Sequence, residues 1–361
     1  MKLRTAILGA TGFVGQRFVQ LLEKHPWFDV TVLGASERSV GKQYGEAAHW
    51  LLDTPMPKGF AWKSVVACTL EAVKKEANAS SSGRDGIDLV FSCLPNELAG
   101  PCEEAFARAG LPVISKASAH RMDADVPLVI PEVNPDHDGL ITAQRKTRKW
   151  DGFISCDPNC STTPLALTLK PLMGMGVKRV HVTTLQGLSG AGYPGVASLD
   201  ALGNVVPFIS GEEEKIEQET PKILGQLAKS GDRIQPARIE ISASCNRVPV
   251  LEGHLENVFV EFERDVSIEA VRGAWDEFHG AIHSLKLPSA QPPIIYKDEP
   301  NRPQHRLDVF NGKGMSTTIG RLRLDGPRRI KYACLSHNTI QGAAGGAILH
   351  AEALKANGLL D

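Results

Sequence analysis

Short apolar runs alternate with amphipathic stretches over the first part of the chain. Strands are expected at residues 3–8, 30–35, 87–92, 112–115 and 126–130, with helices at 13–24, 70–77 and 97–109. Strands that alternate with helices favour right-handed crossovers, and these make neighbouring strands parallel. Residues 79–86 and 144–149 are expected to be surface loops, the second because its basic side chains suit a solvated insertion.

The pattern changes after residue 160, where longer β-rich runs appear. Strands are expected at residues 177–185, 238–244, 255–262 and 328–335, with helices at 212–228 and 267–278. This order predicts an α+β domain with a mixed or antiparallel sheet. The helix expected at 338–349 is rich in small residues, which suit close packing back on the first domain. We therefore expect one domain from residues 1–158 and 339–361, and a second from residues 159–338.

A glycine-rich turn follows the first strand directly and opens the first helix. Its sequence is a Gly-x-x-Gly-x-x-Gly variant of the dinucleotide fingerprint. Glycines in this context permit a tight turn, close approach of the backbone to a pyrophosphate, and close packing of helix on strand. The first domain is thus predicted to be an α/β, Rossmann-type parallel-sheet domain. The expected cofactor contacts in the turn are Gly9, Thr11, Gly12, Phe13, Val14 and Gly15.

The end of the second strand predicts which dinucleotide is bound. An NAD site usually has Asp or Glu there for the ribose 2′-hydroxyl. This chain has Arg38 and Lys42, with Ser36 and Ser39, which suit a 2′-phosphate. Glu37 is the opposing signal because it could bind the hydroxyl, and a solvated charged loop is the plainer alternative. NADP is the preferred cofactor.

Composition narrows the range of functions. The 361 residues suffice for two domains, and a hydrophobic content of 42% supports a large core. A formal net charge of −1 argues against nucleic acid or an anionic membrane as the main partner. No apolar run reaches the ~18 residues of a membrane span, and the first strand begins too early for a signal peptide. Seven scattered cysteines do not resemble a disulfide framework, so a cytoplasmic protein is expected.

Cys160 stands where an extended run, 152–156, gives way to a helical one that carries Pro164 in its first turn. A thiol at that junction faces the helix dipole and free backbone N–H groups, and both are expected to favour the thiolate. The same N–H groups could hold an oxyanion. The plainer alternative is a small buried hydrophobic residue, as most cysteines are.

A hydride cofactor together with an activated cysteine suggests chemistry at the acyl or aldehyde level. The thiolate attacks an acyl carbon, a thioester forms, and reduction by hydride gives an aldehyde. Such chemistry needs a group that moves protons, and eleven histidines compete for that role. Residue type alone does not select one of them.

Several segments together resemble the aspartate-β-semialdehyde dehydrogenases, most closely the archaeal and fungal branch. The resemblance covers nearly the whole chain. The segments that carry it are Gly9–Gly15, Ser118–Met122, Pro131–Asn134, Asn159–Thr162, Gln186–Gly192, Glu212-x-x-Lys215, Arg247-Val248-Pro249-Val250 with Gly253-His254, and Asn338-Thr339.

The resemblance implies an activity and the residues that carry it out. The activity is NADPH-dependent reduction of L-aspartyl-4-phosphate to L-aspartate 4-semialdehyde and phosphate, a step toward threonine, methionine and lysine. Cys160 is the implied nucleophile, His254 the acid and base, and Gln186 the residue that orients the thioester. Asn338 and the Ser189–Gly192 segment, including Gly190, are implied to lie near the nicotinamide.

Charged residues from distant segments are implied to bind the substrate. Arg247 would hold the α-carboxylate through a bidentate fork, and Glu212 would meet the α-ammonium. Lys215, Arg121 and Asn159 would hold the phosphate. Glu212 and Lys215 could instead be a surface pair three residues apart on a helix, and Arg247 could be structural.

Lys116 departs from the family pattern. Relatives often have Asn at this position of the Ser-Asn-Ala-Ser-Ala-His-Arg segment, whereas this chain has Lys. Contact with the cofactor or the phosphate is conceivable from the residue type. The family's role is therefore not transferred to Lys116.

Three other functions remain open. N-acetyl-γ-glutamyl-phosphate reductases usually have Gly before the nucleophile and Tyr soon after it, which Asn159-Cys160-Ser161 fits poorly. Malonyl-CoA reductases share the sequence of this branch and are harder to exclude. A non-catalytic NADP-sensing protein would not need both Cys160 and His254. The resemblance also implies a homodimer or homotetramer formed through the second domain.

Overall fold

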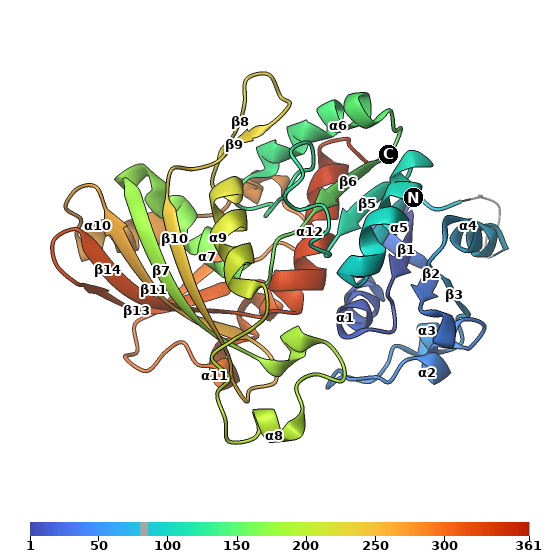
Figure 1. Ribbon diagram of the computed structural model, residues 1–361, viewed down its shortest axis with the longest axis horizontal. Coiled ribbons are helices and arrows are strands. Elements are labelled where there is room, and N and C mark those ends of the chain that lie inside the picture. Colours follow the sequence, from blue (N-terminus) through green and yellow to red (C-terminus); the bar gives the residue numbers. More distant parts are fainter. Residues whose placement is uncertain (80–85, 361) are drawn as a thin grey trace.

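The computed structural model describes residues 1–79 and 86–360, which form two sheets side by side (Figure 1). The loop expected at residues 79–86 falls almost wholly outside the described residues. Strands β1–β6 form one sheet, and β7 and β10–β14 form the other.

The first sheet has six parallel strands in the order β3-β2-β1-β4-β5-β6. These strands are β1 (Leu3–Leu8), β2 (Phe28–Ala35), β3 (Val65–Ala67), β4 (Leu89–Ser92), β5 (Pro112–Ser115) and β6 (Phe153–Cys156). This is the strand order of dinucleotide-binding folds, in which ligands bind beyond the carboxyl ends of the strands. The predicted Rossmann-type sheet is confirmed.

Helices from both ends of the chain cover the first sheet (Figure 1). They are α1 (Phe13–Leu22), α4 (Leu70–Ala79), α5 (Asn96–Arg108), α6 (Leu140–Arg148) and α12 (Gly345–Ala356), with the short α2 (Tyr44–Ala47) and α3 (Lys58–Ala61). Ala347, Ile348 and Ala351 of α12 lie in one core cluster with Phe18 and Phe91. The C-terminal helix therefore returns to the first sheet, as its small residues predict. The domain boundaries themselves remain a prediction.

The second sheet is mixed, as predicted, in the order β10-β7-β11-β14-β13-β12. Its strands are β7 (Val177–Gln186), β10 (Glu240–Arg247), β11 (His254–Phe262), β12 (Ile294–Lys297), β13 (Thr317–Leu324) and β14 (Arg329–Ser336). The central three pairs are antiparallel, while β10 with β7 and β12 with β13 are parallel. Strands β12 and β13 were not predicted from the sequence.

The second sheet packs against helices on one face. These are α7 (Thr162–Leu169), α9 (Glu212–Ile223) and α10 (Ile268–Asp276). The short α8 (Ser198–Ala201), α11 (His305–Asp308), β8 (Gln226–Leu227) and β9 (Ile234–Gln235) lie in the connections. One core cluster includes Val90 of the first sheet, Leu165 of α7 and Val258 of the second, so the two sheets share a hydrophobic interior.

Two expectations for local structure are wrong. Residues 126–130 make only one bridge, Leu128 to Cys156, because Pro127 and Pro131 at or beside this run lack the N–H that a ladder needs. The basic segment 144–149 is not a loop, since all but its last residue belongs to α6. The Gln144 amide is buried there and pairs with both backbone groups of Ile154, which fixes the helix on β6.

Candidate active site

A cleft of about 570 Å³ lies at the carboxyl ends of four strands of the first sheet. Its walls come from segments far apart in the sequence. They include Gly12–Gly15 after β1, residues 93–96 after β4, Lys116 after β5, residues 158–160 after β6, residues 189–193, and residues 338–343. The first and second domains therefore both contribute to one site.

The glycines of the turn have different structural roles. Gly9 has φ of 83°, and a Cβ there would lie 2.7 Å from the Cys93 carbonyl oxygen. A Cβ at Gly15 would lie 2.2 Å from the Gly9 oxygen, so α1 packs closely on β1 only without a side chain. Gly12 is exposed and lines the cleft, which leaves its backbone open to a ligand.

The rest of the turn fits a dinucleotide. Phe13 and Val14 begin α1 and line the cleft, so the first N–H groups of that helix lie at its wall. The Thr11 carbonyl accepts a hydrogen bond of 2.9 Å from Gln16 Nε2, which ties the turn to the helix. A pyrophosphate at this turn would meet backbone donors and the positive end of the helix dipole.

The predicted 2′-phosphate residues follow β2 directly. Ser36, Arg38 and Lys42 are exposed, and Ser39 is largely buried in the short helical turn there. Glu37 is exposed as well, so the structure leaves both kinds of ribose contact available. These charges lie beside the glycine turn because β2 is the neighbour of β1.

The structure brings Cys160 and His254 together across 94 positions of sequence. Cys160 Sγ lies 3.1 Å from His254 Nε2. The thiol is placed by the loop before α7, and the imidazole by the first residue of β11. The Gly187 N–H lies 3.1 Å from His254 Nδ1 and also donates to the Gly253 carbonyl at 3.0 Å, so this contact does not fix the tautomer, and Nε2 can accept a proton from the sulfur that it faces.

Burial governs the resting protonation of this pair. It raises the pKa of the Cys160 thiol to about 12, and the nearby Glu212 carboxylate adds to the rise. Burial also lowers the pKa of His254 to about 4. The pair is therefore a neutral thiol and a neutral imidazole at pH 7. The expectation that the helix terminus alone favours the thiolate is wrong, because desolvation is the larger effect here.

Asn159 occupies the helix terminus that was expected to be free. Its Oδ1 accepts from the Ser161 N–H at 2.8 Å and the Thr162 N–H at 3.2 Å. Those two donors are therefore already used to cap α7, and they do not face a substrate oxygen. The expected oxyanion site at these N–H groups is corrected accordingly.

Glu212 connects three of the predicted substrate residues. Its Oε1 accepts from Asn159 Nδ2 at 2.8 Å and from Gln186 Nε2 at 2.9 Å, and Lys215 Nζ lies 3.4 Å from its Oε2. Burial opposes the charged form, but the two amide bonds and Lys215 hold the pKa of the Glu212 carboxyl below its usual range. Glu212 is therefore a buried anion in the wall of the site, not a member of an exposed surface pair.

Arg121 lies in the cleft wall with part of its guanidinium already bound. Nη1 donates to Glu219 at 2.8 Å, and Nη2 donates to the Lys116 carbonyl at 2.7 Å. The buried Nε has no hydrogen-bond partner. Glu219 also accepts from the Asn159 N–H at 2.7 Å, so one carboxylate positions both an arginine and the backbone beside Cys160.

Sequence reasoning missed Glu219 and Lys222. Lys222 Nζ donates to the carbonyls of Arg121, Asp123 and Val126 at 2.6, 2.9 and 3.0 Å, and so fixes the loop that carries Arg121. Glu212 and Lys215 precede Glu219 and Lys222 on α9 at intervals of three, four and three residues. Helical periodicity, extended from the recognised pair, would have placed all four on one face.

Arg247 lies next to the catalytic pair. Its Nη1 donates to the Gly187 carbonyl at 2.6 Å. A Cβ on Gly190 would lie 3.0 Å from that nitrogen and 3.3 Å from His254 Cε1, so Gly190 fits between the two side chains. The guanidinium, the imidazole and the glycine loop thus meet at one point of the site.

Asn338 links the glycine loop to the catalytic strand. Its Nδ2 donates to Ser189 Oγ, and its Oδ1 accepts from the Gly253 N–H, both at 2.8 Å. Asn338 and Ser189 line the cleft opposite the glycine turn of the first domain. Both residues therefore belong to the cleft, and their contact with a nicotinamide stays a prediction.

A second network that the sequence did not reveal joins the two domains. Glu252 accepts from Arg17 of α1 at 2.6 Å and from Thr339 at 2.9 Å, and it lies 3.2 Å from His337. Although burial opposes it, the contact with His337, the nearby Arg17 cation and the bond from Thr339 lower the pKa of Glu252 to about 2. The residue two positions before His254 is thus tied to the nucleotide-binding helix.

The described residues offer neither a metal-binding cluster nor a membrane-spanning helix. Among residues 1–79 and 86–360, no group of His, Cys, Asp or Glu side chains could hold a metal ion. Within the same described ranges, no helix combines the length and apolar character needed to cross a membrane. All seven cysteines are free thiols.

The fold and the site together define a class of protein. The carboxyl ends of a dinucleotide-binding sheet, Cys160 with its partner His254, and the largely buried cations Lys116 and Arg121 meet at one cleft. This arrangement is that of a two-domain oxidoreductase that acts through a cysteine.

Known proteins show the same architecture. Residues 4–139 match the model of the semialdehyde dehydrogenase NAD binding domain, and residues 169–341 match that of the dimerisation domain. The chain belongs to the semialdehyde dehydrogenase family. The resemblance stated from its motifs is thereby confirmed.

Individual relatives span nearly the whole chain. An aspartate-semialdehyde dehydrogenase of Archaeoglobus fulgidus is 50% identical, with 98% of each chain covered. A malonyl CoA reductase (NADP) of Metallosphaera sedula is 40% identical, with 99% of this chain and 98% of that protein covered. The crystal structure of aspartate semialdehyde dehydrogenase with NADP from Candida albicans has a TM-score of 0.89 and 41% identity, and 99% of each chain is covered.

Proposed function

We propose that this protein reduces L-aspartyl-4-phosphate to L-aspartate 4-semialdehyde and phosphate with NADPH, in the pathway to threonine, methionine and lysine. The observation that carries the proposal is the 3.1 Å contact between Cys160 Sγ and His254 Nε2 in a cleft whose other wall is the glycine turn. Relatives named for this activity, at up to 50% identity, support it.

The first chemical step belongs to Cys160. Its Sγ attacks the acyl carbon, the bond to phosphate breaks, and a thioester remains on the sulfur. The resting thiol must lose its proton for this, and the neutral ring of His254 is the base within reach. Gln186 lies in the same wall, where its bond to Glu212 fixes the amide. We assign to it the orientation of the thioester.

The second step reduces the thioester. A cofactor whose pyrophosphate is held at the glycine turn would supply the hydride. The thiohemiacetal oxygen is then an alkoxide, which forms the aldehyde carbonyl as the carbon–sulfur bond breaks, and the Cys160 thiolate that leaves takes back the proton that His254 carries. Ser189, Gly190 and Asn338 are the residues whose loop and side chains border the nicotinamide site.

Charge distribution around the cleft fits an amino-acid acyl phosphate. We assign the α-carboxylate to Arg247, which adjoins His254 at Gly190. The Glu212 anion suits the α-ammonium. We assign the phosphate to the cations Arg121 and Lys215. Asn159 belongs to the same group because its side chain is bonded to Glu212, which also contacts Lys215. An apolar acyl group would form no ion pair with these charges.

The cofactor assignment rests on the loop after β2. Arg38 and Lys42 are exposed cations beside the glycine turn, where a 2′-phosphate would lie. The relative from Candida albicans was solved with NADP, which supports the same choice. Ser36 and Ser39 add hydroxyl donors.

Malonyl-CoA reduction is the second candidate, because a relative with that name is 40% identical. Both reactions pass through a thioester on Cys160, so Cys160 does not distinguish the two substrates. The charges of Arg247 and Glu212 favour aspartyl phosphate, because they suit its α-carboxylate and α-ammonium groups. The test is NADP⁺ reduction with aspartate semialdehyde and phosphate, compared with NADPH oxidation by malonyl-CoA. Phosphate-dependent NADPH formation supports the proposal, and activity with malonyl-CoA alone refutes it.

The assembly is proposed to be a homodimer or homotetramer. The connection from β7 to α9 exposes large apolar side chains that suit burial against a second copy. They are Tyr193, Leu199, Leu202, Val205 and Phe208. The match of residues 169–341 to a dimerisation domain supports the same assignment. The free thiols fit the predicted cytoplasmic location.

A further inference from the structure

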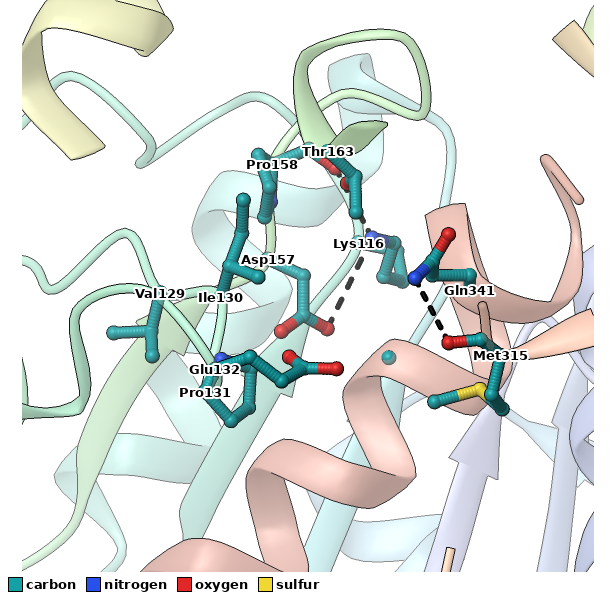
Figure 2. A pocket seen from close by; sticks show the side chains of 11 residues that line it. Lys116, Val129, Ile130, Pro131, Glu132, Asp157, Pro158, Thr163, Met315 and Gln341 are labelled. Carbon is teal, nitrogen blue, oxygen red and sulfur yellow. Dashed lines mark hydrogen bonds and ion pairs between the residues drawn. The ribbon is translucent and has the colours of Figure 1, made fainter. Parts of the chain in front are cut away.

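Figure 2 shows a second, small cavity, which adjoins the cleft because Lys116 and Pro158 line both. It has room for about one water molecule, with an accessible volume of about 10 Å³. Lys116, Glu132 and Asp157 bring charged groups to its wall, and Met315 and Gln341 close it from the C-terminal side. Lys116 is the notable member because it also lines the cleft that contains Cys160.

Lys116 is fixed at the backbone that leads to the nucleophile. Its Nζ donates to the Pro158 carbonyl at 3.1 Å and lies 3.9 Å from Asp157 Oδ2 (Figure 2). Its side chain is only 8% exposed, so the charge is held within the protein and is weakly screened. The Lys116 ammonium therefore lies against the backbone of Pro158, two residues before Cys160.

Buried anions behind Lys116 sustain that charge. Asp157 Oδ1 lies 3.1 Å from His350 Nδ1, and His350 Nε2 lies 3.1 Å from Asp138. Although burial opposes it, these two carboxylates raise the pKa of His350 to about 10, so the ring is a cation between them. Among the described residues, Asp157 Oδ2 has no hydrogen-bond partner, and it lies 3.9 Å from the Lys116 ammonium.

We propose that Lys116 is a positioning residue for the reaction, which supplies the positive charge that makes the Cys160 thiolate accessible in the buried site. The proposal rests on the proposed role of Cys160 as the nucleophile. It assigns a function to a residue for which the family pattern gave none.

The charges around Cys160 show why such a residue is needed. Glu212 and burial both oppose ionisation of the thiol, while Lys116, Arg121 and Arg247 favour it. Arg121 is already paired with Glu219. A substrate carboxylate would pair with Arg247 under the proposed function. Lys116 is then the cation that continues to act on the sulfur when substrate is bound.

The Lys116 ammonium and the Cys160 thiolate depend on each other. Burial, with the nearby Arg121, holds the pKa of Lys116 below its ordinary value, while Asp157, Cys160 and Glu219 oppose that shift. Glu132 shares the cavity, and burial raises the pKa of that carboxyl to about 7. A thiolate at Cys160 and an ammonium at Lys116 therefore stabilise each other, and the Asp157 anion holds the ammonium in place.

The test measures ionisation of Cys160 without turnover. Alkylation by iodoacetamide is followed against pH, with the Cys160 peptide quantified by mass spectrometry so that the other cysteines do not interfere. Lys116→Gln keeps a donor for the Pro158 carbonyl but removes the charge. We expect alkylation to slow about tenfold below the thiol pKa, which is a shift of about one pKa unit. Lys116→Arg keeps the charge and should stay within about twofold of the unaltered protein.

A control variant removes a lysine charge elsewhere in the protein. Lys178→Met removes an exposed lysine charge on β7 and should leave the profile unchanged. Circular dichroism confirms that each variant is folded.

Two results overturn the proposal. One is an alkylation profile of Lys116→Gln that superimposes on that of the unaltered protein. The other is an equal slowing in Lys116→Arg, which keeps the charge. A Lys116→Gln variant with unchanged alkylation but a raised KM for phosphate would place Lys116 in the phosphate site instead. Loss of the proposed function is a separate result, because alkylation of the thiol requires neither the substrate nor the cofactor.

Discussion

The two walls of the cleft are built in different ways. On the nucleotide side, a short local motif presents backbone groups, and the charges of the ribose loop are exposed to solvent. On the chemical side, side chains from distant strands and helices converge, and their charges are buried at 0–9% exposure except for Lys215, which is 32% exposed. Asn159, Gln186 and Glu212 illustrate this, since each is bonded to another member of the group.

The difference teaches where binding and reactivity are set. Exposed charges are screened by water and contribute modestly, whereas buried charges shift pKa values and depend strongly on their partners. The comparison therefore predicts large effects for changes on the chemical side and small ones on the nucleotide side.

The largest effect is expected at the nucleophile. Cys160→Ala should lower kcat by on the order of 10⁴-fold or more, because no other group forms the thioester. NADPH binding should be unchanged, since the glycine turn is a separate wall. Steady-state kinetics and fluorescence titration of NADPH measure the two properties. Cys156→Ala, in the buried strand β6, is the matched control and should retain activity; near-normal turnover of Cys160→Ala would contradict the mechanism.

Glu132 tests the cost of buried charge through stability. Its pKa in the folded protein is about 7, above the ordinary value of 4.5. The stability contributed by the protonated carboxyl is therefore fully present below pH 4.5 and is lost as pH rises through 7. Glu132→Gln should therefore stabilise the protein by about 3 kcal/mol at pH 8 and little at pH 4.5. Chemical denaturation at the two pH values measures this. Equal shifts at both would show that ionisation is not involved.

Arg247→Lys examines the geometry of substrate binding. A lysine keeps the charge but lacks the planar fork, so KM for aspartate semialdehyde should rise about 10–100-fold with a smaller change in kcat. Arg179 forms an exposed ion pair with Glu240, and Arg179→Lys is the control, which should leave KM for aspartate semialdehyde unchanged. Unaltered kinetics of Arg247→Lys would dismiss the proposed carboxylate contact.

The smallest effect is expected on the ribose loop. Arg38→Ala should raise KM for NADPH about fivefold, the size of one exposed ion pair, and the effect should diminish at high salt. KM for NADH is the internal control because NADH lacks the 2′-phosphate. An equal rise for both cofactors would argue against a 2′-phosphate contact.

The sequence predicted the parts of the molecule that depend on local patterns. The parallel sheet, the glycine turn and the position of Cys160 just before α7 all follow from periodicity and turn chemistry. The basic helix α6 was mistaken for a loop because its buried face depends on Gln144, a polar residue that finds its partners on β6 only in the fold.

The state of the thiol was also beyond the sequence. The helix terminus is visible in the residues, but the Asn159 cap that uses its N–H groups is not, nor is the burial that raises the pKa. Glu219 and Glu252 escaped notice for a similar reason. Their importance comes from partners up to 235 positions away, Arg17 being the partner of Glu252.

The most direct test of the central claim is to trap the acyl group on the enzyme. The protein is mixed with aspartyl phosphate in the absence of NADPH, quenched in acid, digested and examined by mass spectrometry. The account predicts one aspartyl group in thioester linkage at Cys160, released as the semialdehyde when NADPH is added before the quench. An acyl group on another residue, or none while turnover proceeds normally, would contradict it.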